Sequence, residues 1–137
     1  MTNPLPNGII ETLGTSTTVA QAGERLTNAV EAHPKLGLIA TVDHTAGAVK
    51  VGLELEPTVE MFIGNPNVGT PLMQLARTAS IDLPQKMVIT QDGDGVRVLH
   101  NDPQYIADRH GIPADTPELE TAAGALQNLA NVAAGIA

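Results

Sequence analysis

Two runs rich in strand-forming residues flank an Asp/Gly turn, and this pattern constrains the fold more than any other part of the sequence. The runs are residues 86–91 and 96–101, and Asp92-Gly93-Asp94-Gly95 lies between them. Asp-Gly pairs accept the positive φ angles of tight hairpin turns. The pattern therefore predicts a β-hairpin, and with it a sheet that contains antiparallel strands.

Three further apolar runs have the length of strands. They occupy residues 9–13, 36–42 and 58–63. The second run is almost continuously apolar or small, which is typical of a strand that is covered on both faces. In the third, apolar and polar residues alternate, as in a strand with one buried face. Residues 1–8 show neither pattern, and we expect them to form a flexible tail.

Helix-capping signals separate these strands. Each predicted helix starts at a residue whose side chain can accept a hydrogen bond from a free backbone N–H group. The predicted caps are Thr18, Thr70, Asp102 and Thr116, and a shorter helix is expected at residues 45–51. The helix after Thr116 is rich in alanine. The sequence thus predicts an α+β fold, with one domain at residues 9–137 and a mixed or antiparallel sheet packed with helices.

Composition narrows the classes of partner. The net charge is −8 and the pI is about 4.7, and aromatic residues make up 1% of the chain. An acidic chain with few stacking rings is a poor match for nucleic acid or for an anionic membrane surface. The chain contains no cysteine, and no apolar run approaches a membrane span. Because the N-terminus also lacks a secretory signal pattern, we expect a cytoplasmic protein.

The segment at residues 64–73 is the first candidate site. It reads as a strand end, a glycine-bearing turn and the start of a helix, where backbone N–H groups can hold an anion. A small anionic ligand is therefore one interpretation, and a structural turn capped by its own threonine is the other. The residues predicted to contact the ligand here are Asn65, Gly69, Thr70 and Met73, with Phe62 as a further apolar wall.

Asp43 and His44 form the second candidate, as the one adjacent pair of an acid and an imidazole. An aspartate can orient a histidine for acid–base chemistry, or the two side chains can together bind a divalent cation. However, neighbouring residues of a strand point to opposite faces, so Asp43 can instead cap the next turn while His44 packs at the strand end. The histidines lack the paired spacing of zinc ligands, and the Asp/Gly turn lacks the other ligands of a calcium loop. No metal and no cofactor is predicted.

Several short motifs occur in an order that resembles domain-of-unknown-function family 302. The resemblance covers about residues 15–112 and rests on the segments 40–44, 51–58, 62–66, 69–73, 82–84 and 101–103. It implies a compact α+β fold, often dimeric, and it implies no activity. Gln85 stands where the family usually has an apolar residue, and Thr90 and His100 stand where aromatic residues are common. If these positions line a pocket, this chain has a wider or more polar one.

Three functions are compatible with the sequence. The first is a small ligand-binding or accessory domain, a homodimer as the resemblance implies, whose pocket joins Asp43 and His44 to the turn at residues 64–73. The second is an enzyme that uses His44 as general acid or base, oriented by Asp43. The third is a structural subunit that binds a partner through its alanine-rich C-terminal helix.

Overall fold

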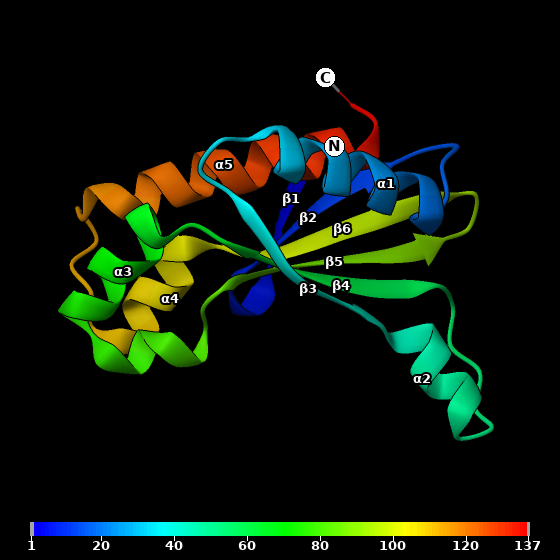
Figure 1. The fold of residues 1–137 in the computed structure, drawn as a ribbon, viewed down its shortest axis with the longest axis horizontal. Helices are drawn as coiled ribbons and strands as arrows, with labels where there is room; N and C mark the ends of the chain where they lie inside the picture. The colour runs from blue at the N-terminus through cyan, green and yellow to red at the C-terminus, as the bar shows by residue number, and fades with distance from the viewer. Residues whose placement is uncertain (1, 137) are drawn as a thin grey trace.

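The computed structural model describes residues 2–136, which form one six-stranded antiparallel sheet with helices packed on it (Figure 1). The strand order is β1-β2-β6-β5-β4-β3. The α+β prediction is confirmed. The strands are β1 (Thr2–Leu5), β2 (Ile9–Gly14), β3 (Gly37–Asp43), β4 (Thr58–Gly64), β5 (Gln85–Asp92) and β6 (Gly95–Asn101).

The hairpin predicted around the Asp/Gly turn is present as β5 and β6. Asp92 pairs with Gly95, and the strands continue in register to Met87 and His100. Gly93 has a φ of 62°, the left-handed conformation for which glycine is preferred at such turns. These two strands lie in the middle of the sheet, so the clearest local signal in the sequence also builds its centre.

The N-terminal segment is a strand, and the prediction of a flexible tail is wrong for the described residues 2–8; Met1 and Ala137 lie outside the described residues. β1 pairs with β2 from Thr2–Thr12 to Leu5–Ile9. Asn7 and Gly8, at φ 67° and 73°, turn the chain between the two strands. An Asn-Gly pair is a hairpin signal, and Pro4 is tolerated because β1 lies at the sheet edge.

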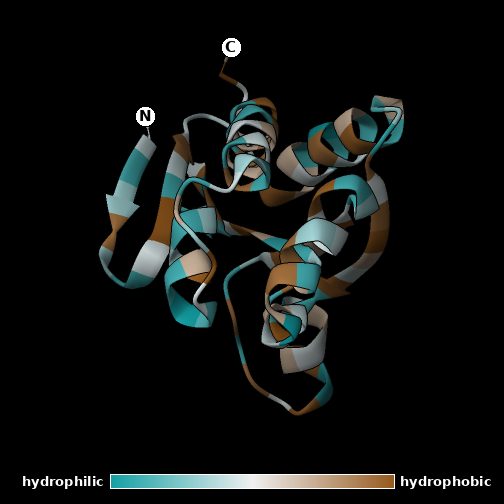
Figure 2. Cartoon of the chain, turned by 90° about the vertical axis from the view of Figure 1, so that its left-hand side faces the viewer, coloured by the Kyte–Doolittle hydropathy of each residue, from teal (hydrophilic) through white to brown (hydrophobic). Residues whose placement is uncertain are grey.

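Two long helices, α1 (Val19–Ala32) and α5 (Pro117–Ala134), cover one face of the sheet. The capping box predicted at Thr18 is formed with Gln21. Figure 2 shows apolar and polar residues mixed along the helices, as expected for elements with one buried side. The main core lies between these helices and the strands, and its largest fully buried members are Leu26, Val30, Met61, Met87, Ile89, Val96 and Val98.

A second cluster closes one end of the sheet, where α3 (Pro66–Leu75), a 3-10 helix η2 (Arg77–Ile81) and α4 (Pro103–His110) gather near the start of α5. Its buried residues are Leu72, Ala79, Ala107, Ile112 and Leu119. The sequence predicts α3 to start after Thr70, and this start is wrong. Asn65 is the N-cap and Pro66 the first helical residue. Both Asn65-Pro66 and Thr70-Pro71 match a cap followed by proline, and the earlier pair starts the helix.

The opposite end of the sheet is far less covered. β3 is an edge strand and is exposed along nearly all of its length, so the prediction that both its faces are covered is wrong. The short helix predicted next is present as α2 (His44–Lys50), and Gly52 follows it at a φ of 75°. α2 projects from the sheet, away from α1 and α5 (Figure 1). Side chains of a strand point alternately to the two faces of a sheet. The face opposite the main core is not covered by α1 or α5.

Candidate functional site

An apolar cavity lies between α3, α5 and the adjoining ends of β4 and β5, with a volume of about 50 Å³. Because roughly 10–15 Å³ of such volume holds one water molecule, this space admits a ligand of only a few heavy atoms. Its walls are mainly aliphatic and come from both helices. The apolar lining residues are Leu36, Ile63, Val68, Leu72, Leu83, Ala122, Ala125, Leu126 and Leu129.

Polar groups at the cavity come from Asn65, Gln85 and Thr121. The Thr121 hydroxyl already donates to the carbonyl of Pro117 at 3.3 Å. By contrast, the side-chain oxygen Oε1 of Gln85 is buried, and it has no hydrogen-bond partner within the described residues. A buried acceptor without a donor costs about 1–3 kcal/mol. A ligand that donates a hydrogen bond would remove this cost.

The turn at Asn65 does not offer free backbone donors to an anion. The Asn65 side chain accepts from Asn67 N at 3.1 Å, and its carbonyl accepts from Val68 N and Gly69 N at 3.0 and 2.8 Å. Pro66 carries no N–H group. The helix start therefore satisfies its own donors, but through Asn65 and not through the threonine that the structural interpretation named. Asn65 and Gly69 do line the cavity.

Thr70 and Met73 lie within α3 rather than at its start. Thr70 is exposed and Met73 is half-buried. Neither residue lines the cavity beside Asn65 and Gly69. Of the four residues predicted at this turn, the structure thus brings two to one cavity.

Asp43 and His44 lie at the other end of β4. Asp43 pairs with Val59 near the start of that strand, whereas Asn65 follows its last residue. Six residues of extended chain span about 20 Å. The structure therefore does not join the two halves of the predicted site, and α2 and α3 lie at opposite ends of the sheet (Figure 1).

The local contacts of this pair also differ from those of a catalytic dyad. Asp43 caps α2 by accepting from Ala46 N at 3.0 Å. His44 Nε2 instead meets Glu60 Oε1 at 2.9 Å, on an exposed surface. The carboxylate partner of His44 is therefore Glu60, from the neighbouring strand, which a sequence motif of adjacent residues could not reveal.

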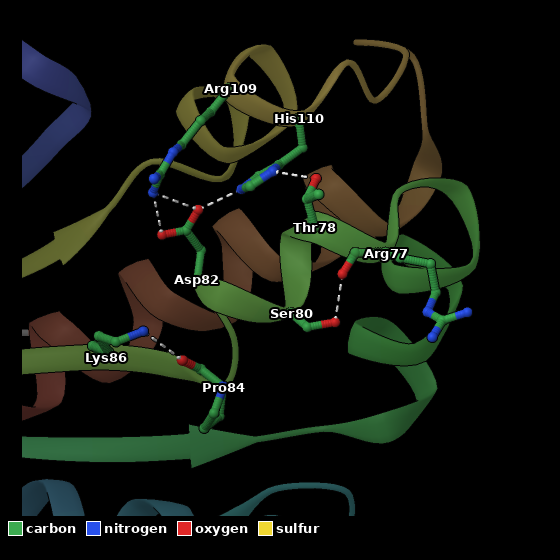
Figure 3. A network of polar contacts seen from close by, with 8 residues as sticks. All are labelled: Arg77, Thr78, Ser80, Asp82, Pro84, Lys86, Arg109 and His110. Carbon is green, nitrogen blue, oxygen red and sulfur yellow. Dashed lines mark hydrogen bonds and ion pairs between the residues drawn. The ribbon is translucent and has the colours of Figure 1, made fainter.

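A polar network that the sequence did not reveal joins η2 to α4 (Figure 3). His110 Nε2 lies 2.5 Å from Asp82 Oδ2, and His110 Nδ1 lies 2.8 Å from the Thr78 hydroxyl. Arg109 Nη1 contacts both carboxylate oxygens of Asp82, at 3.0 and 3.1 Å. The His110 and Asp82 side chains are largely buried. Arg109 and His110, on α4, both bind the carboxylate of Asp82, which directly follows η2. We call this network the clamp, because it links these two short helices.

Two other ionisable groups are perturbed. The hydrogen bond from Arg97 Nε to Glu11 Oε2, at 2.5 Å, lowers the pKa of Glu11 below its ordinary value. Burial lowers the pKa of His100, whose Nδ1 lies 3.1 Å from the carbonyl of Asn101 and whose Nε2 has no partner within the described residues. Among these residues, no three His, Asp or Glu side chains are placed to hold a metal ion.

Comparison with protein families decides the relationship that the ordered motifs suggested. The family described as "Domain of unknown function DUF302" matches residues 11–136. The chain belongs to the DUF302 family. A crystal structure of an uncharacterized conserved DUF302 protein from Bacillus stearothermophilus superposes with a TM-score of 0.80 at 17% identity, and covers 92% of this chain and 98% of that one. This likeness confirms the DUF302 fold, and it shows the fold alone.

Curated relatives match a shorter stretch of this DUF302 chain. The fluoride-specific ion channel FluC 1 of Brucella suis is 44% identical over 78 residues, which is 56% of this chain and 31% of that protein. FluC 1 of Brucella abortus matches to the same extent and over 29% of its length. The chain thus spans about a third of these relatives. None of the helices within residues 2–136 is long and apolar enough to cross a membrane.

Proposed function

We propose that this DUF302 chain is a small accessory domain that binds a compact, mainly apolar ligand between α3 and α5. The observation that carries the proposal is the buried Gln85 oxygen without a partner, at a cavity whose other walls are aliphatic. Binding sites typically combine an apolar lining with a few polar groups that fix orientation. Gln85 and Asn65 supply those groups here.

The chemistry of the cavity favours a neutral hydrogen-bond donor over the anion expected from the turn. No Lys, Arg or His is among the described residues that line it. The nearby helix start has already satisfied its own N–H groups. A buried anion without a countercharge is strongly disfavoured. A small alcohol or amide that donates to Gln85 meets no such penalty.

The accessory role is supported by the relatives. In proteins named as fluoride-specific ion channels, a stretch similar to this chain makes up about a third of the length. We propose that the domain is cytoplasmic, that it forms a homodimer, and that it assists the activity of another protein. The alternative of partner binding through the alanine-rich face of α5 has less support, because that face packs on α1 and the sheet.

Three molecules of similar size test the ligand chemistry: 2-propanol carries a donor, acetone only an acceptor, and acetate a negative charge. Titration of the ¹⁵N-labelled protein, followed by NMR, should show saturable shifts at Gly69, Gln85 and Ala125 with 2-propanol. For four heavy atoms we expect millimolar affinity. Acetone should bind more weakly, and acetate weakest. Tightest binding of acetate would return the site to the anion interpretation.

Two variants separate the cavity from unspecific effects. Ala125→Leu fills the space and should abolish the shifts at Gly69. Gln85→Leu should remove the preference for 2-propanol over acetone while the fold persists, because it replaces an unpartnered polar group by an apolar one. Ala123→Leu, on the same helix outside the cavity lining, is the matched control. If the three probes shift the NMR resonances of Ala125→Leu and Gln85→Leu as they shift those of the parent chain, the cavity is not a binding site.

A further inference from the structure

Residues 37–57, which we call the arm, expose an unusual amount of apolar surface. The arm comprises β3, α2 and the connector that leads to β4. Of the eleven exposed large apolar side chains within residues 2–136, six lie in the arm: Ile39, Val42, Val49, Val51, Leu53 and Leu55. Exposed apolar side chains gathered in one segment in this way favour an interaction site.

The arm is shaped by hydrogen bonds although its apolar side chains are uncovered. The Thr45 hydroxyl donates to the carbonyl of Glu56 at 3.1 Å and accepts from Thr58 N at 2.9 Å. Yet α2 has only seven residues and none of them is buried. Isolated helices shorter than about 12–15 residues are marginal in water. Contacts of α2 within the chain are with β4 and the connector, and they leave its apolar side chains available to a partner.

A second apolar surface, made of half-buried side chains, lies on the sheet face opposite the main core. We call it the open sheet face; its central residues, from β2, β4, β5 and β6, are Ile9, Phe62, Val88 and Leu99. Phe62, Val88 and Leu99 alternate along their strands with buried residues of the main core, and Ile9 lies on the same face through the pairing of β2 with β6. A groove of about 190 Å³ runs over Ile9, Val88 and Leu99, with Lys86 and Glu60 at its sides.

Lys86 on the open sheet face and two glutamates of the arm offer one complementary charge contact between these surfaces, although Glu60 also borders the groove and Lys50 also lies in the arm. Lys86 lies on the open sheet face with its Nζ 5.9 Å from the centre of the Phe62 ring, and it has no carboxylate partner within the described residues. The arm carries Glu54 and Glu56, which are exposed and likewise form no ion pair in that part of the chain. In a chain of net charge −8, such a contact opposes part of the repulsion between two copies.

We propose that the arm of one copy packs on the open sheet face of a second copy, and that the arm of the second copy packs in the same way on the open sheet face of the first. The apolar side chains of α2 and the connector then cover Phe62, Val88 and Leu99, and Glu54 or Glu56 reaches Lys86. Such an isologous contact closes on itself and leaves neither surface uncovered. The interface rests on the homodimer proposed above and is independent of the ligand cavity.

Analytical ultracentrifugation over a range of concentrations tests the interface. The wild type should be a dimer, and the double variant Val51→Asp/Leu53→Asp should be a monomer with an unchanged circular dichroism spectrum. Both residues are 65–69% exposed in the single chain, so their replacement does not open its core. Ile81→Asp is the matched control, because Ile81 is 69% exposed on η2, outside the interface. This variant should remain a dimer.

Crosslinking locates the contact, since the chain has no cysteine of its own. A ¹⁵N-labelled Leu55→Cys chain is mixed with an unlabelled Val88→Cys chain and treated with a short bismaleimide. Dimers of mixed mass should form, whereas a mixture of Leu55→Cys with Glu31→Cys, on the helix-covered side, should form few. A wild type that stays monomeric overturns both the homodimer and the interface. A dimer that survives Val51→Asp/Leu53→Asp and gives no mixed crosslink overturns the interface and leaves the homodimer standing.

Discussion

The helices at the two ends of β4 differ in how much of their surface is packed against the rest of the chain. At the end near Gly64, α3 caps itself through Asn65, and its apolar side chains pack against α4 and α5. At the end near Thr58, α2 is capped just as well by Asp43 but buries none of its residues. Hydrogen bonding at a helix start therefore does not indicate whether the helix is packed. The first end is completed within the chain, and the second is completed, in our account, by another copy.

The same substitution at each end gives the largest expected contrast. Leu72→Ala, at a fully buried site on α3, should lower the free energy of unfolding by about 2–5 kcal/mol. Leu53→Ala, on the arm, should leave unfolding of the dilute protein within about 0.5 kcal/mol of the parent. Urea denaturation at micromolar and at high concentration measures both. If Leu72→Ala and Leu53→Ala lower the free energy of unfolding of the dilute protein equally, the two ends do not differ in packing.

The clamp between η2 and α4 should be the next strongest contributor. Asp82→Ala removes the partner of the buried His110 side chain and of Arg109, and should cost about 1–3 kcal/mol in urea denaturation. Asp108→Ala, an exposed carboxylate on α4 without an ion pair in the described residues, is the control and should cost little. A cost of Asp82→Ala no larger than that of the control would mean that the clamp contributes nothing to the fold.

The two caps should differ in what they stabilise. Asn65→Ala should lower the free energy of unfolding by about 1 kcal/mol, because α3 is part of the packed body. Asp43→Ala should instead weaken dimerisation by about 30-fold, because each of the two copies loses a cap worth about 1 kcal/mol, with little change in the dilute protein. Sedimentation equilibrium and urea denaturation separate these effects. Destabilisation of the dilute protein by Asp43→Ala would show that α2 is packed within a single chain.

The smallest effect expected is a pH dependence that belongs to neither end. Burial holds the pKa of His100 below its ordinary value of about 6.5, so the unfolded chain takes up the proton first as pH falls. The free energy of unfolding should therefore be greatest above pH 6.5 and decrease from there toward the lowered pKa. In His100→Leu this decrease between pH 7.5 and 5 should be shallower. The same slope in both proteins would assign the pH dependence to other groups.

Most of the fold could be predicted because its signals are local. The Asp/Gly hairpin and the caps at Thr18 and Asp102 act within a few residues, and each is present as expected. β3 was mispredicted because an apolar run looks alike in a strand covered by its own chain and in an edge strand that exposes it. The start of α3 was mispredicted because two Pro-containing segments offer equivalent caps.

The candidate site was less predictable, because its parts come together only through packing. Asn65 and Gly69 were identified from the turn, yet the α5 wall at Ala125 lies some sixty residues away in the sequence. Gln85 was visible only as an unusual residue in the family pattern, and its buried oxygen without a partner became apparent only in the structure. The sequence also predicted that Asp43 and His44 lie in the same site as Asn65. In the structure, the length of β4 separates that pair from Asn65.

Hydrogen exchange tests most directly whether the arm is completed by a second copy. Amide protection in α2 and at Leu53 should rise with protein concentration, while protection in α3 should stay constant, because only the arm gains packing on dimerisation. The Val51→Asp/Leu53→Asp variant should show low arm protection at every concentration. Arm protection that is independent of concentration, and equal in wild type and variant, would contradict the account.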